Sequence, residues 1–133
     1  MTRYMLDTNI VSDLIRNPSG KAARRVADIG DRHICTSIIV AAELRYGSLK
    51  NGSMRLLQLV EGLLGEIPVL SFEAPADAEY GAIRSELERA GRTIGANDLL
   101  IAAHARASAT TLVTANLREF KRVRDLKVEN WLA

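Results

Sequence analysis

Tyr4-Met5-Leu6-Asp7-Thr8-Asn9-Ile10-Val11 is the stretch of sequence that decides the fold. Its apolar start, residues 4–6, predicts a short buried strand, and a carboxylate follows directly at Asp7. A helix is predicted next over residues 9–16, and it is ended by Asn17-Pro18-Ser19-Gly20. A strand that leads at once into a helix is the unit we expect to recur along the chain.

The alternation of strands and helices does recur to the end of the sequence. Further strands are predicted over residues 33–36, 68–70, 111–114 and 128–131. Further helices are predicted over residues 21–29, 37–46, 54–64, 74–90 and 97–107, with Ser37 capping the second of these and Gly47 ending it. This pattern predicts an α/β fold with a central, mostly parallel sheet flanked by helices on both faces.

Composition fits one globular domain over residues 1–133, with 47% hydrophobic and 26% charged residues. The single cysteine, Cys35, excludes an internal disulfide and a cysteine-based metal site. We see no signal peptide and no apolar run of membrane-spanning length, so we expect a cytoplasmic protein. The net charge of +2 is too small to indicate nucleic-acid binding by itself.

Three carboxylates occupy positions that are unusual for surface residues. Asp7 follows the first strand, Glu43 is the only charge between Cys35 and Leu44, and Asp98 is the only charge between residues 93 and 103. Glu43 and Asp98 have no basic residue one helical turn away, so a local ion pair does not explain them. Buried carboxylates need compensation, and hard cations such as Mg²⁺ bind clustered carboxylate oxygens.

Topology predicts that these acids meet, because ligands of open α/β sheets bind outside the carboxyl ends of the strands. Asp7 lies at one such end, Asn116 at another, and Asp98 in a first helical turn. Each also has an ordinary interpretation: Asp7 as a helix cap, Asp98 as a partner of the helix dipole, Asn116 as a turn residue. Glu43, inside an apolar helix, has no such explanation. We therefore predict a joint acidic site.

Four segments resemble the motifs of PIN-domain ribonucleases, and most closely the VapC toxins of toxin–antitoxin pairs. They are MLDTNI at residues 5–10, AAELRYG at 41–47, IGANDLLIAAHA at 94–105 and VTANLREF at 113–120, followed by ENW at 129–131. The resemblance covers essentially the whole chain, in the family's order. It implies a parallel sheet flanked by helices and Mg²⁺-dependent or Mn²⁺-dependent hydrolysis of RNA phosphodiesters.

By the same resemblance Asp7, Glu43 and Asp98 are catalytic and hold the metal. The fourth position is Asn116, where many PIN domains carry aspartate. This departure leaves open whether the site holds a second metal ion. Glu119, one helical turn further, either compensates or is a surface acid paired with Arg122.

Several other residues have two interpretations each. Thr8 and Thr114 resemble family hydroxyls near the metal, or belong to ordinary turn and strand chemistry. Asn9 and Asn97 either support the acids or cap helices, and the cap is the commoner role. The basic stretch that contains Arg118, Lys121 and Arg122 either tracks RNA phosphates or forms a solvated face. His104 points to another helical face than Asp98 and receives no catalytic role.

The resemblance also implies partners and a target. A VapC-type toxin pairs with a small antitoxin, forms a homodimer, and inhibits translation by cutting RNA; relatives cut transfer RNA or a ribosomal RNA loop, and this short type suggests the initiator tRNA anticodon loop. Surplus apolar residues on the helices over 54–64 and 9–16 predict an interface. The alternative is that one core buries both helices.

Two other function classes stay open at this point. A phosphoaspartate-type phosphotransfer domain also places an aspartate after its first strand, but its second acid is missing here, since position 9 is Asn9. A non-catalytic α/β binding module tolerates a neutral residue at Asn116. Metal-dependent cleavage of RNA by the purified chain distinguishes the three classes.

Overall fold

A five-stranded parallel sheet forms the centre of the computed structural model, which describes residues 2–133. The strand order is β3-β2-β1-β4-β5. The strands are β1 (Tyr4–Leu6), β2 (Ile34–Ser37), β3 (Val69–Leu70), β4 (Thr111–Val113) and β5 (Val128–Glu129). Leu6 pairs with Thr36 of β2 and Val113 of β4, so these three strands end at the same edge of the sheet. The expected α/β fold is confirmed.

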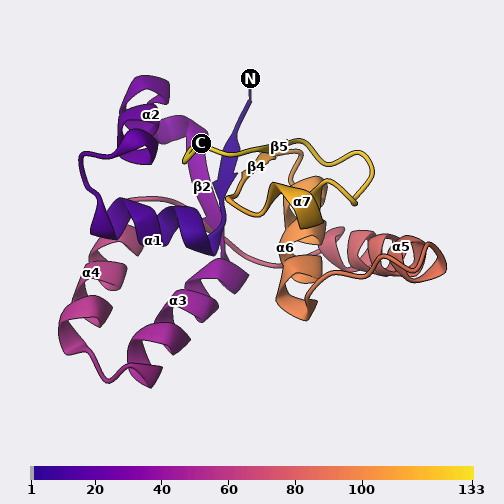
Figure 1. Cartoon of the computed structure of the whole chain (residues 1–133), viewed down its shortest axis with the longest axis horizontal. Coiled ribbons are helices and arrows are strands. Elements are labelled where there is room, and N and C mark those ends of the chain that lie inside the picture. Colours follow the sequence, from indigo (N-terminus) through magenta and orange to yellow (C-terminus); the bar gives the residue numbers. More distant parts are fainter. Residues whose placement is uncertain (1) are drawn as a thin grey trace.

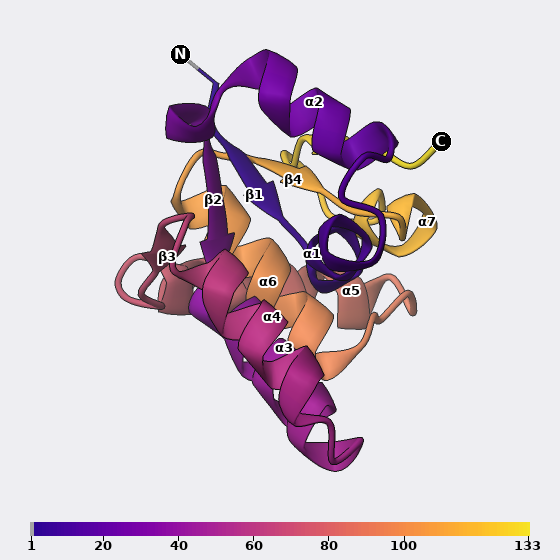
Figure 2. The ribbon, with the colours of Figure 1, turned by 90° about the vertical axis from the view of Figure 1, so that its left-hand side faces the viewer.

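Helices cover both faces of this sheet (Figure 1). The helices α1, α2 and α4 lie on one side, and α5 and α6 on the other, while α3 runs on from the end of β2 (Figure 2). Their bounds are α1 (Thr8–Arg16), α2 (Lys21–Ile29), α3 (Ile38–Lys50), α4 (Met54–Leu64), α5 (Ala76–Arg89), α6 (Ala96–Ala107) and α7 (Leu117–Phe120), with a short 3₁₀ turn over Asp31–His33. Between residues 2 and 133, no helix has the length and apolarity needed to cross a membrane.

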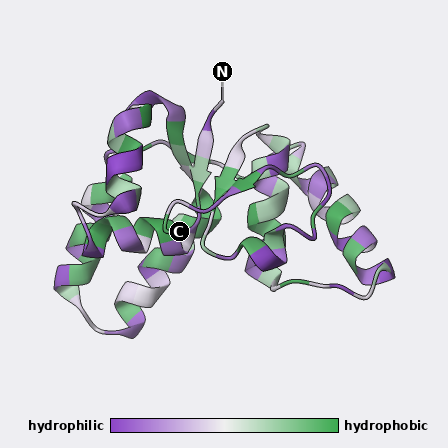
Figure 3. Ribbon diagram, turned by 45° about the horizontal axis from the view of Figure 1, so that its top comes forward, coloured by the Kyte–Doolittle hydropathy of each residue, from purple (hydrophilic) through white to green (hydrophobic). Residues whose placement is uncertain are grey.

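The core lies where β1, β2 and β4 meet the inner faces of the helices (Figure 3). Met5 and Leu6 of β1 are fully buried, because a central parallel strand has helices on both faces. Cys35 of β2 is also fully buried, as a small apolar side chain would be. Asp7 lies directly after the end of β1, where α1 begins, and is also buried.

Two residues that were predicted to end or cap a helix do not do so. Gly47 does not end α3, which continues to Lys50 and stops before Gly52, whose φ of 64° favours glycine. A glycine inside a helix costs only about 1 kcal/mol, which the packing of α3 against α4 offsets. Asn97 is not a cap either, because α6 begins at Ala96 after Gly95, and Asn97 is already inside the first turn.

The surplus apolar surface lies on α3 and α4, and not on α4 and α1 as expected. On α1, Ile10 and Val11 are fully buried and the remaining apolar residues are half-buried against the core, so α1 has little surface to spare. On α4, the prediction is confirmed in part by the exposed side chains of Met54 and Leu59. The larger contribution comes from α3, with Ile38, Tyr46 and Leu49 exposed.

Candidate active site

Asp7 is held at the edge of the sheet by the strands themselves. Its backbone N–H donates to the carbonyl of Val113, which continues the pairing of β1 and β4. One carboxylate oxygen accepts from the N–H of Thr8 at 2.8 Å and the other from the hydroxyl of Thr114 at 2.8 Å. The side chain is 4% exposed. Burial raises the pKa of Asp7, the bonds from Thr114 and Thr8 lower that pKa, and the charge of Glu43 raises it further.

Glu43 ties three helices together at this edge. One oxygen of its carboxylate accepts from the hydroxyl of Thr8 at 2.6 Å, across from α1. The other accepts from the side-chain amide of Asn97 at 3.2 Å, across from α6. A mid-helix acid among apolar residues therefore obtains its partners from two other helices. The supporting interpretation of Asn97 fits this contact, and the capping interpretation is wrong.

Asp98 lies in the first turn of α6 and faces other carboxylates. Its pKa is raised from 3.8 to about 7, first by burial and then by its direct contact with the Glu119 side chain. The charges of Asp7 and Glu43 raise the same pKa further. We call Asp7, Glu43, Asp98 and Glu119 the acidic group. Like charges this close disfavour full ionisation, so Asp98 keeps its proton to a higher pH than a free aspartate does.

Asn116 reaches the acidic group through Glu119. Its side-chain amide donates to a carboxylate oxygen of Glu119 at 3.1 Å, and its backbone N–H donates to the hydroxyl of Thr114 at 3.0 Å. Asn9 holds the same loop from the other side, because its side-chain oxygen accepts from the N–H of Ala115 at 3.0 Å. Asp7, and not Asn9, caps α1.

The donor set of the acidic group fits a hard divalent cation. None of its four carboxylates takes part in an ion pair within residues 2–133, so their charge has no basic side chain to offset it. Carboxylate oxygens are the ligands that Mg²⁺ and Mn²⁺ prefer. Over the same residues, no three acidic, cysteine or histidine side chains already stand in a finished metal-binding arrangement. Two of the carboxylates have neutral partners: the side chains of Thr8 and Asn97 donate to Glu43, and the hydroxyl of Thr114 donates to Asp7.

The three basic residues proposed for RNA differ in exposure. Arg118 and Lys121 are exposed, as a solvated or phosphate-binding face requires. Arg122 is half-buried instead: its guanidinium donates to the carbonyl of Thr93 at 3.0 Å, and its Nε is buried without a hydrogen-bond partner in residues 2–133. Arg122 makes no side-chain ion pair with Glu119 there, so that alternative for Glu119 is wrong.

His104 and Trp131 belong to the core. His104 is 2% exposed, its Nδ1 lies 2.7 Å from the hydroxyl of Ser37, and its ring meets Phe72 edge-on. Burial lowers the pKa of His104. Trp131 packs on Tyr4 with ring centroids 5.2 Å apart. Neither contacts the acidic group.

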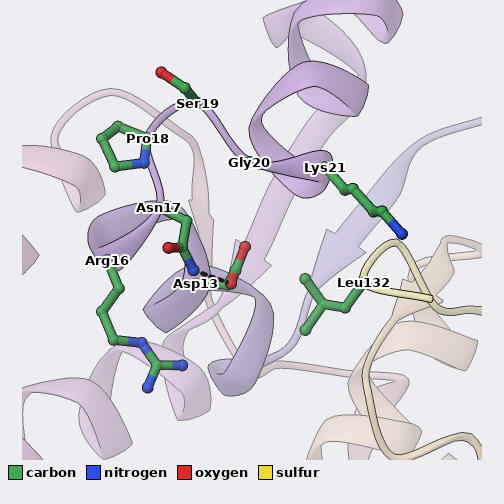
Figure 4. A pocket seen from close by; sticks show the side chains of 8 residues that line it. All are labelled: Asp13, Arg16, Asn17, Pro18, Ser19, Gly20, Lys21 and Leu132. Atoms are coloured by element: carbon green, nitrogen blue, oxygen red, sulfur yellow. Dashed lines mark hydrogen bonds between the residues drawn. The ribbon is translucent and has the colours of Figure 1, made fainter.

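Two cavities adjoin Glu43 and Thr8. One, of about 380 Å³, lies between α1, α3 and α4, and the other, of about 570 Å³, lies between α3 and α6 beside Tyr46. Tyr46 was given no role in the sequence prediction, although it lies one helical turn from Glu43. A third cavity, of about 520 Å³, lies at the end of α1 (Figure 4). The side-chain amide of Asn17 donates to Asp13 there, and Lys21 and Leu132 complete the wall. No member of the acidic group lines it.

The PIN domain model matches residues 4–126. The chain is 42% identical to the ribonuclease VapC2 of Haemophilus influenzae, over 99% of this chain and 100% of that protein. It is 39% identical to the tRNA(fMet)-specific endonuclease VapC of Shigella flexneri, over 98% and 99%. The DNA-bound VapBC structure of Salmonella typhimurium matches with a TM-score of 0.90 and 36% identity, over 98% and 99%.

Proposed function

The chain belongs to the PIN-domain family, among its VapC ribonucleases, and from this premise we propose that it is a Mg²⁺-dependent endoribonuclease with the acidic group as its active site. The observation that carries the proposal is the environment of Asp98. Asp98 sits among three other carboxylates with no basic side chain paired to any of the four in residues 2–133. Membership of this family removes the phosphoaspartate-type alternative.

The residues of the site divide into ligands and supports. Asp7, Glu43 and Asp98 would hold the metal, with Glu119 contributing beside Asn116. When bound there, a divalent cation lowers the pKa of a water molecule and polarises the scissile phosphate. Mn²⁺ shares the preference for oxygen ligands and serves as the alternative ion.

The chain's own hydrogen bonds orient these ligands. Thr114 and the Thr8 N–H fix the two oxygens of Asp7, while the Thr8 hydroxyl and the Asn97 amide fix those of Glu43. Each carboxylate thus keeps one rotamer, and its remaining lone pairs are free to face the site. Exposed Arg118 and Lys121 lie on the α7 side of the acidic group and supply positive charge for RNA phosphates.

The biological role that we propose is that of a toxin. Relatives named above are a ribonuclease and a tRNA(fMet)-specific endonuclease, and two of the matching solved structures are VapBC complexes bound to DNA. We propose that this chain cuts initiator tRNA in its anticodon loop, inhibits translation, and pairs with an antitoxin as a homodimer. The exposed side chains of Ile38 on α3 and of Met54 and Leu59 on α4 provide apolar surface for such partners.

Cleavage of RNA by the purified chain tests the activity. We expect cutting of initiator tRNA with Mg²⁺ or Mn²⁺ and none with EDTA, leaving 5′-phosphate and 3′-hydroxyl ends. Asp7→Asn and Asp98→Asn should each lower the cleavage rate by at least about 100-fold, since each removes a charged ligand from the metal. Asp28→Asn, on the exposed face of α2, is the control and should cut like the wild type. Retained cleavage by both site variants would refute the assignment.

A further inference from the structure

Tyr46 is the one aromatic side chain that residues 2–133 leave in solvent. The chain has one Trp, three Tyr and two Phe, and the other five are buried or half-buried. Tyr46 is 65% exposed and contributes little to the core. Its position on α3, one turn beyond Glu43, puts its ring on the same side of the helix as the acid.

A cavity joins Tyr46 to the acidic group. It has a volume of about 570 Å³, within the usual range for ligand sites. Ile39 and Leu100 give it apolar walls, while Glu43, Thr8 and Asn97 form its polar part. Because Glu43 and Thr8 border both the cavity and the acidic group, a group seated beside Tyr46 lies next to whatever the acids act on.

The chemistry of the walls selects the occupant. The wall holds the carboxylate of Glu43 and no basic side chain, so it repels a phosphate. A flat, neutral ring with polar edges suits it better: the face can stack on Tyr46, and the edge can meet the amide of Asn97. Positive charge lies just outside, where the ammonium of Lys50 stands 6.0 Å from the centre of the Tyr46 ring. This arrangement matches a nucleobase inside and its phosphate at the rim.

We propose that the cavity between α3 and α6 binds an unpaired nucleobase of the RNA that flanks the cleaved phosphate, with Tyr46 as its stacking platform. This inference rests on the proposed ribonuclease function, because it assigns a base next to that active site. Stacking of a base on an aromatic side chain is sequence-tolerant, so the cavity selects unpaired RNA over paired RNA and leaves the identity of the base open.

Binding of a simple RNA probe tests the proposal without depending on cleavage. The probe is a fluorescein-labelled oligoadenylate, with an abasic ribose oligomer of the same length as its counterpart, and Ca²⁺ replaces Mg²⁺ to prevent cutting. Fluorescence anisotropy gives the Kd of each for the wild type, Tyr46→Leu, Tyr46→Phe and Leu49→Ala. Leu49 is the matched control, because it is 66% exposed on the same helix and does not line the cavity.

We expect Tyr46→Leu to weaken oligoadenylate binding about tenfold, and Tyr46→Phe and Leu49→Ala to stay within about twofold of wild type. With the abasic oligomer, Tyr46→Leu and the wild type should bind equally, because there is no base to stack. Equal binding of oligoadenylate by Tyr46→Leu and Leu49→Ala overturns the proposal, and so does a loss that persists with the abasic probe. The wild type tests the same idea with no substitution, since it should itself prefer the oligomer with bases.

A separate readout keeps this inference apart from the proposed function. If the wild-type chain binds oligoadenylate through Tyr46 but cuts no RNA with Mg²⁺, the ribonuclease proposal fails and the base site stands. If it cuts RNA and Tyr46→Leu changes neither RNA binding nor KM, the base site fails alone. If Tyr46→Leu instead weakens only the binding of a co-expressed protein partner, the cavity belongs to that partner and the nucleobase is the wrong occupant.

Discussion

Asp98→Asn should make the metal-free protein more stable at neutral and alkaline pH. The side chain keeps its shape and its place in the first turn of α6, and loses only its charge. Asp98 contacts Glu119 directly, and the negative charges of Asp7 and Glu43 raise its pKa further. Removing one charge from four therefore relieves repulsion that no basic side chain in residues 2–133 offsets by an ion pair.

The pKa of Asp98 sets the size and the pH window of this effect. The folded chain has a pKa of about 7 at Asp98, against 3.8 when unfolded. Between these values the folded state keeps a proton that the unfolded state releases, so the stability from this group falls as pH rises from about 4 to about 7. A difference of about 3 in pKa sets a ceiling of about 4 kcal/mol. Asp98 is partly exposed, and solvent screening reduces the cost to about 1–2 kcal/mol.

Urea unfolding in EDTA measures this cost. At about pH 8, Asp98→Asn should unfold at higher urea than the wild type, by about 1–2 kcal/mol of unfolding free energy, or roughly 3–10 °C in Tm. At about pH 4 the two should agree, because both carry a neutral group at this position. Comparing them at equal pH cancels the contribution of His104, whose pKa is lowered by burial in both. Asp28→Asn, an exposed acid on α2, should change stability by no more than about 0.5 kcal/mol.

Added Mg²⁺ should reverse the order. The wild type gains stability by binding the ion in its folded state, and Asp98→Asn gains less because it has lost a charged ligand. If the wild type in EDTA is as stable at about pH 8 as the variant, the acids do not repel one another as the structure indicates. The acidic group would then be a set of separate surface carboxylates.

Three further outcomes are expected from the same geometry. Asn116→Asp should tighten Mg²⁺ binding and lower metal-free stability, because it replaces the amide that donates to Glu119 with a fifth charge; calorimetric titration that shows equal or weaker affinity places residue 116 outside the metal site. Arg122→Gln should weaken Mg²⁺ binding without changing the salt dependence of RNA binding, since Arg122 anchors the Thr93 carbonyl ahead of α6. Arg118→Ala should instead reduce the slope of RNA affinity against salt by about 1 and leave Mg²⁺ binding unchanged. The reverse pattern would make Arg122 an RNA contact. The protein should sediment as a homodimer, and a clean monomer would contradict this. It should lose activity on binding its antitoxin. If the antitoxin sends a basic side chain to Asp7 and Asp98, the inhibition should weaken as the Mg²⁺ concentration rises.

The sequence predicted where Asp7 and Glu43 lie in the fold, because a simple rule applies to each. Asp7 ends a strand, and the carboxyl ends of parallel strands meet at one edge, so its location followed from the apolar run at residues 4–6. Glu43 stood out because nothing local could pair with it. The sequence could not predict which groups donate to Glu43. They are the Thr8 hydroxyl and the Asn97 amide, from helices that are distant in the chain.

Local propensity misled wherever tertiary contacts decided the outcome. Asn97 has the side chain of a helix cap, yet packing of α6 against α3 gives its amide to Glu43. Arg122 has the sequence context of a basic surface, yet its guanidinium is drawn to the Thr93 carbonyl. The choice between the two interpretations of Glu119 depended on which neighbour it meets, and that neighbour, Asp98, comes from another element.

The neutral residue at Asn116 leaves the charge of the site intact. Its amide donates to one oxygen of Glu119 and so holds that side chain beside Asp98. The acidic group therefore carries four carboxylates without an aspartate at 116, the fourth coming from one helical turn further along the chain. On this account Glu119→Gln should weaken Mg²⁺ binding as much as a loss of Glu43 does, and Asn116→Ala should do so less, because it removes only the support. Equal Mg²⁺ affinity of Glu119→Gln and the wild type by calorimetry would mean that the site works with three acids.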